Sequence, residues 1–129
     1  PKMSPIVGTM LVVDDDAFNR VLLATSLEET GYTVEMAEDG LQALEILRTK
    51  PIDVVLLDLM MPEMDGYDTI SSIRRDPRFK ELAIIALSAN ADPKVRERCL
   101  AAGADDFLAK PIEPATLKTQ IKQLLSRKM

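Results

Sequence analysis

Histidine and tryptophan are absent from this 129-residue sequence. Without histidine the chain has neither the usual general base of enzymes nor the commonest transition-metal ligand, so its chemistry must use carboxylates, lysine and hydroxyl groups. The single cysteine, Cys99, cannot form a disulfide within the chain. It falls in an amphipathic stretch, which indicates an ordinary helical residue rather than a reactive thiol, and we expect a reducing compartment.

A surplus of basic residues and long apolar runs are also missing. The net charge of −5 argues against a nucleic-acid surface, because phosphate backbones require clustered Lys and Arg. The longest apolar runs, such as residues 54–57 and 82–87, are too short to span a bilayer, and the N-terminus carries no basic and then apolar leader. We therefore expect a cytoplasmic protein without direct nucleic-acid binding or membrane insertion.

The sequence does contain a regular alternation of two kinds of segment. Five short β-rich runs each precede a segment of helical periodicity, which is the pattern of a parallel sheet covered on both faces by helices. The expected strands are residues 10–14, 32–37, 53–58, 82–88 and 106–109. The third is almost wholly aliphatic, as is typical of a central strand buried on both faces.

Capping residues mark the expected helices. The first helix covers about residues 17–30, with Asp16 as its N-cap and Gly31 at its end. The second helix starts at Asp39, and the third starts after the turn-rich residues 61–66. The fourth starts at Asp92 with the proline that follows it, and the last starts at Pro114. One face of the first helix is expected to carry the apolar residues Val21, Leu22 and Leu27. One face of the second helix is expected to carry Leu41, Leu44 and Leu47.

We expect a single domain over residues 10–126. The segment 1–9, with two prolines and a glycine, is expected to be a flexible lead-in, and the last residues are expected to fray. No segment has the composition of an effector domain.

Acidic, hydroxyl and basic side chains lie at the carboxyl ends of the expected strands. Asp14 ends the first strand and Asp15 follows it, Asp58 ends the third, Ser88 ends the fourth and Lys110 follows the fifth. In open parallel sheets, ligands bind beyond these strand ends where the strand order reverses, so the side chains should share one edge. Carboxylates forced together repel one another and persist when a cation neutralises them, and a set of oxygen ligands favours Mg²⁺.

This edge has the parts needed for phosphoryl transfer. A carboxylate can attack phosphorus directly to form an aspartyl phosphate, in a reaction that depends on positioning and charge neutralisation. Lys110 can place a positive charge beside one phosphoryl oxygen, and the Ser88 hydroxyl can donate a hydrogen bond to another.

Four ordered strings, MLVVDDD, VVLLDLMMPEMDG, IIALSANA and DDFLAKPI, resemble the signature segments of response-regulator receiver domains. The resemblance covers about residues 10–125. It implies a flavodoxin-like fold, a doubly wound (βα)5 three-layer sandwich with the strand order 2-1-3-4-5. It also implies a phosphoacceptor switch in two-component or phosphorelay signalling, regulatory rather than enzymatic, which catalyses only its own phosphorylation and dephosphorylation.

The resemblance assigns roles by position. Asp58 matches the phosphoacceptor, and the metal ligands would be Asp14, Asp15, Asp58 and the backbone carbonyl of Met60. The matched switch residues are Ser88 and Phe107, and Lys110 matches the family's active-site lysine; the Lys110–Pro111 bond is expected to be cis. The implied cofactor is Mg²⁺, for which Mn²⁺ can substitute. The implied partners are a sensor histidine kinase or histidine phosphotransfer protein and a downstream protein target.

Other interpretations remain open. Asp16 is better explained as a helix cap than as a ligand, Phe107 as a lone aromatic is equally compatible with core packing, and Lys110 could be a surface lysine. A haloacid-dehalogenase-type phosphatase is a second candidate, although residues 14–18 fit its Asp-x-Asp motif poorly. A pseudo-receiver scaffold is a third, and a nucleotide-binding domain is disfavoured because no Gly-x-Gly-x-x-Gly or Walker loop follows a strand. The sequence leaves open whether the domain is free-standing.

Overall fold

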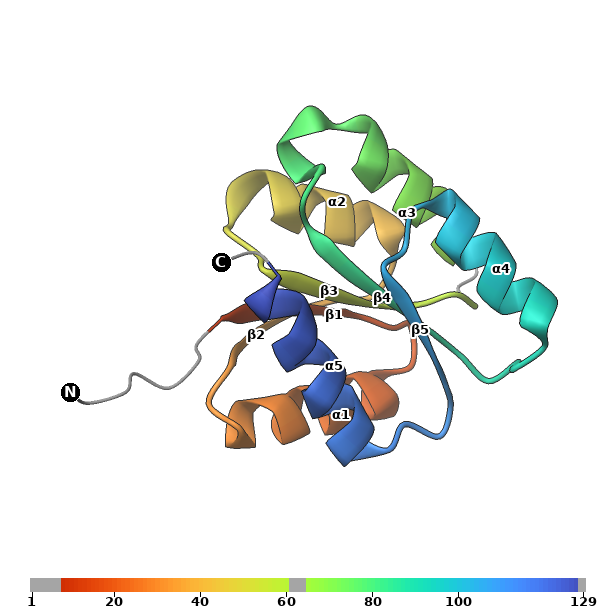
Figure 1. Cartoon of the computed structure of the whole chain (residues 1–129). Helices are drawn as coiled ribbons and strands as arrows, with labels where there is room; N and C mark the ends of the chain where they lie inside the picture. The colour runs from red at the N-terminus through yellow and green to blue at the C-terminus, as the bar shows by residue number, and fades with distance from the viewer. Residues whose placement is uncertain (1–7, 61–64, 128–129) are drawn as a thin grey trace.

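The structure is a computed structural model that describes residues 8–60 and 65–127. In these two ranges strands and α-helices alternate along the chain, and one short 3-10 helix precedes β4 (Figure 1). The elements are β1 (Thr9–Val13), α1 (Ala17–Glu29), β2 (Thr33–Ala37), α2 (Gly40–Thr49), β3 (Val54–Asp58), α3 (Gly66–Arg75), η1 (Pro77–Phe79), β4 (Ala83–Ser88), α4 (Pro93–Ala102), β5 (Asp106–Ala109) and α5 (Pro114–Ser126).

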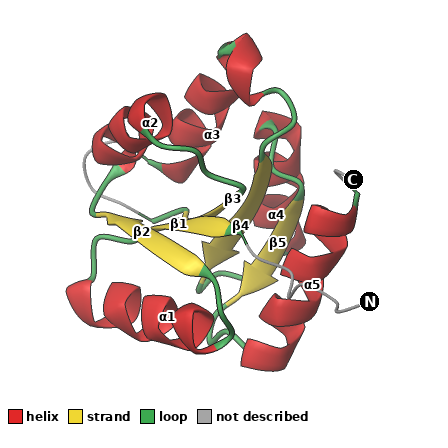
Figure 2. Cartoon of the chain, turned by 90° about the vertical axis from the view of Figure 1, so that its left-hand side faces the viewer, coloured by secondary structure: helices red, strands yellow, loops and turns green. Residues whose placement is uncertain are grey.

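The five strands form one parallel sheet in the order β2-β1-β3-β4-β5, which confirms the predicted fold class. In the register of the sheet, Val12 of β1 lies opposite Leu56 of β3, which lies opposite Ile85 of β4. The helices form a layer on each side of the sheet: α1 and α5 cover one face, and α2, α3 and α4 cover the other (Figures 1 and 2). The strand order reverses between β1 and β3, where a doubly wound sheet binds its ligands.

Alternation along the central strands divides the core between the two faces. Leu11, Val55 and Ile84 pack toward α2, α3 and α4, whereas Val12 and Leu56 pack toward α1 and α5. Because successive strand residues point to opposite faces, a strand covered on both sides needs an unbroken apolar run. Every residue of β3 is buried, as the aliphatic run predicted.

The predicted caps of the first two helices are observed. Asp16 accepts a hydrogen bond from the backbone N–H of Asn19, and Asp39 accepts one from that of Gln42. Gly31 follows α1 with a φ of +108°, a conformation that glycine adopts without the strain of a Cβ. Asp92, at the start of α4, accepts from the backbone N–H of Lys94.

The predicted apolar faces of the first two helices are partly wrong. Val21 and Leu22 are 52% and 59% exposed, and Leu41 is 63% exposed. Leu27 is buried as predicted, and the other buried residue of α1 is Ala24. A helix with many apolar residues allows more than one stripe with a period of 3.6, and the packing on the sheet selects one of them.

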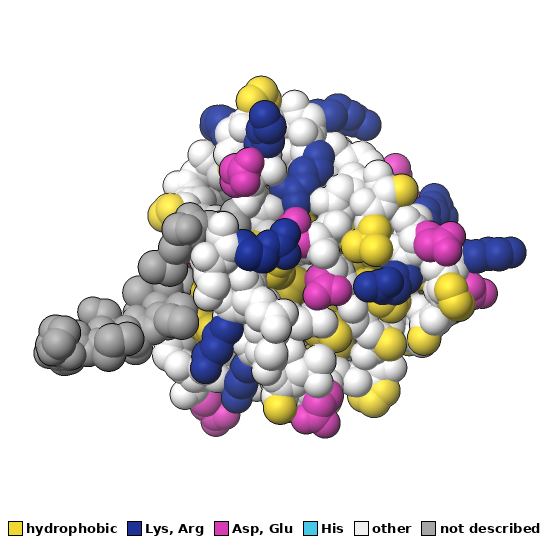
Figure 3. Space-filling view, viewed as in Figure 1, with side chains coloured by type: hydrophobic (Ala, Val, Ile, Leu, Met, Phe, Trp, Pro, Cys, Tyr) yellow, Lys and Arg dark blue, Asp and Glu magenta, His cyan; other side chains and the backbone are white. Residues whose placement is uncertain are grey.

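Several predictions concern residues outside the described ranges. The flexible lead-in falls almost wholly in residues 1–7, most of the turn-rich segment 61–66 lies in residues 61–64, and the fraying C-terminus includes residues 128–129. The 3-10 turn of η1 was not predicted. Among the described residues, no helix is both long and apolar enough to cross a bilayer. On the side of the molecule seen in Figure 3, acidic and basic side chains are interspersed.

Candidate functional site

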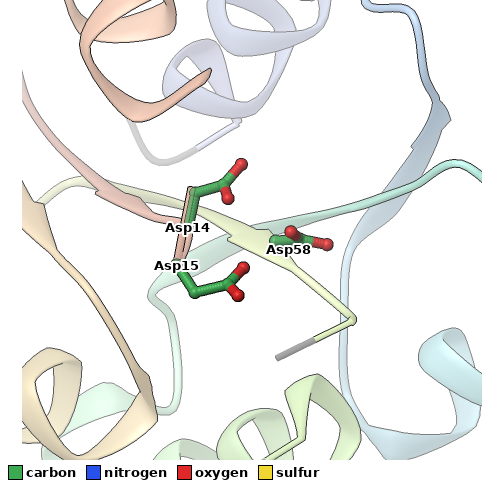
Figure 4. Close-up of side chains that lie close together, drawn as sticks. All are labelled: Asp14, Asp15 and Asp58. Atoms are coloured by element: carbon green, nitrogen blue, oxygen red, sulfur yellow. The ribbon is translucent and has the colours of Figure 1, made fainter. Parts of the chain in front are cut away.

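The carboxyl edge of the sheet brings three acidic side chains together. Asp14 follows β1 directly, Asp15 is the next residue, and Asp58 ends β3, which pairs with β1. Each residue can offer one carboxylate oxygen such that the three atoms lie within 4.8 Å of one another (Figure 4). The predicted convergence of these residues is therefore observed.

Burial differs within this acidic cluster. Asp14 is 4% exposed and Asp58 is 6% exposed, whereas Asp15 is open to solvent. Asp14 Oδ1 accepts the backbone N–H of Asp16 at 2.9 Å, and Asp58 Oδ1 accepts that of Met60 at 3.0 Å. The two buried carboxylates are thus held from within their own loops, while Asp15 forms the open side.

Lys110 lies between the two buried carboxylates. Its Nζ is 3.3 Å from Asp14 Oδ2 and 3.3 Å from Asp58 Oδ2. The lysine follows β5, two strands away from β3, and the Lys110–Pro111 peptide bond is cis as predicted. Lys110 therefore lies in contact with the acidic cluster and is not an isolated surface lysine.

Electrostatics at this edge favour a bound cation. Burial, the largest effect, raises the pKa of Asp58, and the charge of Asp14 raises it further. The Met60 N–H and Lys110 lower this pKa, but the net shift is upward. Burial alone would lower the pKa of Lys110, but the charges of Asp58 and Asp14 outweigh it and the pKa is raised. One lysine thus leaves the three carboxylates under-neutralised, which is the condition that a divalent cation relieves.

The hydroxyl and aromatic residues lie on β4 and β5, the two strands that follow β3 in the sheet. Ser88 ends β4 fully buried, and its Oγ accepts the backbone N–H of Asn90 at 3.0 Å. Phe107 in β5 is half-buried against the core on the α4 side of the sheet. Met60 exposes 68% of its surface, and the role of its carbonyl stays a prediction.

Two residues near the site were missed by the sequence reasoning. Arg20, in α1, donates from Nη1 to the main-chain oxygen of Asp14 at 2.7 Å. Gly66, which opens α3, approaches the backbone that follows Asp58: its N–H donates to the Leu59 carbonyl at 3.1 Å. An arginine in an amphipathic helix carries no signal of such a contact, but the glycine directly after Asp65, the cap of α3, was a usable hint of close approach.

Cys99 is fully buried, and burial raises the pKa of its thiol. A buried thiol of raised pKa is a poor nucleophile, which agrees with its interpretation as a packing residue.

A parallel sheet in the order 2-1-3-4-5, with carboxylates and a lysine converging at one carboxyl edge, defines a flavodoxin-like α/β domain with a candidate cation and phosphoryl site. The sequence model of the response regulator receiver domain matches residues 10–122, and the chain belongs to that family. It is a regulatory phosphoacceptor domain of two-component systems. This membership decides against the phosphatase and nucleotide-binding alternatives.

The relatives occur in proteins of different kinds. The chain is 42% identical over 118 residues to "Probable transcriptional regulator ycf27" of Guillardia theta, covering 92% of this chain and 45% of that protein. It is 42% identical over 109 residues to the sensor histidine kinase RcsC of Salmonella typhimurium, covering 84% of this chain and 11% of the kinase. The chain thus spans about half of the first relative's length and far less of the second.

Among solved structures, the receiver domain of the sensor histidine kinase PA1611 from Pseudomonas aeruginosa PAO1 is similar, with a TM-score of 0.86 and 34% identity. The match covers 94% of this chain and 99% of that one, and that structure has a magnesium ion coordinated in its active-site cleft.

Proposed function

We propose that Asp58 accepts a phosphoryl group from the phosphohistidine of a sensor kinase or a histidine phosphotransfer protein, with Mg²⁺ bound beside it. The observation that carries this proposal is the convergence of Asp14, Asp15 and Asp58 within 4.8 Å, with Lys110 3.3 Å from two of them.

The donor set fits a hard divalent cation. Mg²⁺ prefers oxygen ligands and keeps several waters, which suits three carboxylates of which one is open to solvent. The Met60 carbonyl would complete the protein ligands, and Mn²⁺ would substitute because it accepts the same ligands. The bound cation would neutralise charge on the transferred group. The magnesium in the PA1611 receiver domain supports this assignment.

The chain's own residues would carry out the transfer. A carboxylate oxygen of Asp58 attacks phosphorus, the bond from phosphorus to the donor's imidazole nitrogen breaks, and that nitrogen keeps the electron pair. Lys110 already touches Asp58 Oδ2, so its ammonium is placed to stabilise a phosphoryl oxygen. Attack of water on the acyl phosphate later returns Asp58 and inorganic phosphate.

A groove gives access to this edge. It has a volume of about 740 Å³, and its lining includes the charged residues Asp14 and Lys110 and the apolar residues Leu22, Leu87 and Ile112. Because Asp14 and Lys110 line it, the groove would lead a donor's imidazole toward the acidic cluster.

Phosphorylation would alter the face formed by α4 and β5. New phosphoryl oxygens can attract the Ser88 hydroxyl away from Asn90, which would draw in the loop before α4. Phe107 would then shift against α4, and a downstream protein would detect the change. Phenylalanine has no hydroxyl to stabilise either position, so packing alone would set the balance.

Phosphorylation with acetyl phosphate tests the proposal. Mass spectrometry should show one added phosphoryl group with Mg²⁺ and none after chelation. Asp58→Asn should remove the labelling, because an amide is not a nucleophile. The matched control is Asp68→Asn, at an exposed carboxylate on α3, which should label as the parent does. Equal labelling of the Asp58 variant would refute the assignment, and an unlabelled parent would favour the pseudo-receiver scaffold.

The wider setting is part of the same proposal. A receiver domain over residues 10–126 in the cytoplasm would receive its phosphoryl group from a kinase or phosphotransfer protein and act on a protein target. Phosphotransfer profiling against purified histidine kinases would identify the donor.

A further inference from the structure

We propose that Arg20 is a positioning residue of the acidic cluster: it fixes the peptide group between Asp14 and Asp15, and so holds both carboxylates in a geometry that binds a divalent cation. This inference rests on the proposed function of the cluster. It assigns a role to a side chain that is not itself a ligand.

The contact lies where the regular pairing of β1 ends. Asp14 follows the last residue of β1, and its N–H still donates to the Ala37 carbonyl at 3.2 Å. Its own carbonyl instead accepts Arg20 Nη1 at 2.7 Å. Asp14 is almost fully buried, so this oxygen would lose its partner at a considerable cost if the guanidinium were removed.

Three further hydrogen bonds close the loop onto α1. The Arg20 N–H donates to the Asp16 carbonyl at 2.9 Å, the Asp16 N–H donates to Asp14 Oδ1 at 2.9 Å, and the Asn19 N–H donates to Asp16 Oδ1 at 3.1 Å. These bonds position Asp16 and the carboxylate of Asp14. Among the residues that the structure describes, only the Arg20 guanidinium donates a hydrogen bond to the peptide group that leads to Asp15.

Asp15 depends on that peptide group. Its side chain is exposed, and no hydrogen bond from another described residue restrains its carboxylate. A rotation of the peptide between Asp14 and Asp15 would therefore swing the Asp15 carboxylate out of the 4.8 Å cluster. The fixed planar fork of arginine suits this task better than a flexible ammonium does.

Geometry and charge predict opposite effects, which makes the role testable. If Arg20 acted only as a positive charge beside the cluster, its removal would make the site more negative and strengthen Mg²⁺ binding. If Arg20 positions the ligands, its removal weakens binding, as the loss of a residue that supports metal ligands commonly does by about 10- to 100-fold.

The test compares Arg20→Met and Arg20→Lys with Arg48→Met, an exposed arginine on α2 that provides the same change of charge. Isothermal titration of each folded protein with Mg²⁺ should give a Kd raised at least about 10-fold for Arg20→Met, an intermediate value for Arg20→Lys, and an unchanged value for Arg48→Met. An unchanged or lower Kd in Arg20→Met would overturn the inference. If that variant does not fold, Arg20→Lys decides by the same criterion.

A metal-free measurement separates this inference from the proposed function. If the parent neither binds Mg²⁺ nor accepts phosphate, the proposed function fails by itself. Amide hydrogen exchange at Asp16, whose N–H donates to Asp14 Oδ1, is then compared between Arg20→Met and the parent without metal. Exchange at least about 10-fold faster than in the parent supports the positioning role, and unchanged protection refutes it.

Discussion

Gly66→Ala probes how closely α3 approaches the backbone that presents Asp58. An added Cβ would lie 2.5 Å from Leu59 Cα and 3.0 Å from the main-chain oxygen of Asp58, where an ordinary contact is 3.4 Å or more. The nearest neighbour is backbone, so the start of α3 and the end of β3 must separate by about 1 Å. We expect the variant to be less stable and its acceptor site to be displaced.

The magnitude follows from two opposing contributions. Overpacking of this kind costs about 1–3 kcal/mol, and replacing glycine by alanine in a helix returns up to about 1 kcal/mol. Because the clash is with backbone atoms that cannot rotate away, the overpacking cost lies in the upper part of its range, about 2–3 kcal/mol, and with about 1 kcal/mol returned the net loss is about 1–2 kcal/mol. With an unfolding entropy of about 2.1 cal/mol/K per residue, a chain of this length should lose about 4–7 °C in Tm.

The assay is thermal unfolding by circular dichroism without divalent cations, followed by acetyl phosphate labelling. Thr119→Ala, at an exposed position on α5, serves as control and should keep the parent's Tm within about 2 °C. The Gly66 variant should also label more slowly, because the Asp58 carbonyl and Leu59 must move. A Tm equal to or above that of the parent would show that this close approach is relieved without cost, and the reasoning would fail.

The remaining predictions concern charge, a hydrogen-bonded arginine and signal output. Burial raises the pKa of Asp58, so the folded state holds that proton more tightly than the unfolded state, and stability falls as pH rises from the ordinary carboxyl pKa through the raised one. Without divalent cations, Asp58→Asn should therefore be more stable than the parent at pH 7 and lose this advantage in acid. Denaturant titrations at several pH values measure this difference, and a variant less stable than the parent at pH 7 would contradict the expected direction. Arg74 donates to the carbonyls of Gly103 and Phe79 and to Asp105 at 2.8–3.0 Å, so Arg74→Met should cost about 1–3 kcal/mol in urea unfolding. Arg78→Met, which removes the pair of the exposed Arg78 with Asp76, should change stability little, and equal losses would refute the distinction. Ser88→Ala should still accept phosphate but shift the amides of residues 92–103 less than the parent does; full shifts would show that the hydroxyl does not couple Asp58 to α4.

Much of the fold and the site could be predicted from local patterns. The aliphatic run of β3 identified the central strand, because only a strand covered on both faces tolerates such a sequence. Asp16 and Asp39 marked the starts of their helices, since a capping carboxylate acts within a few residues of itself. The meeting of Asp14, Asp58 and Lys110 followed from their places at strand ends in a parallel sheet.

What the sequence alone determined is therefore the set of contacts that arise from periodicity, capping and strand order, together with the chemistry of the residue types at one edge. Only the tertiary structure decided which stripe of α1 is buried, leaving Val21 and Leu22 exposed, because that choice depends on how the helix packs on the sheet. It also decided that Arg20 reaches the Asp14 carbonyl and that Gly66 lies against Leu59. These contacts depend on the separation and orientation of packed elements, quantities that no local pattern of residues encodes.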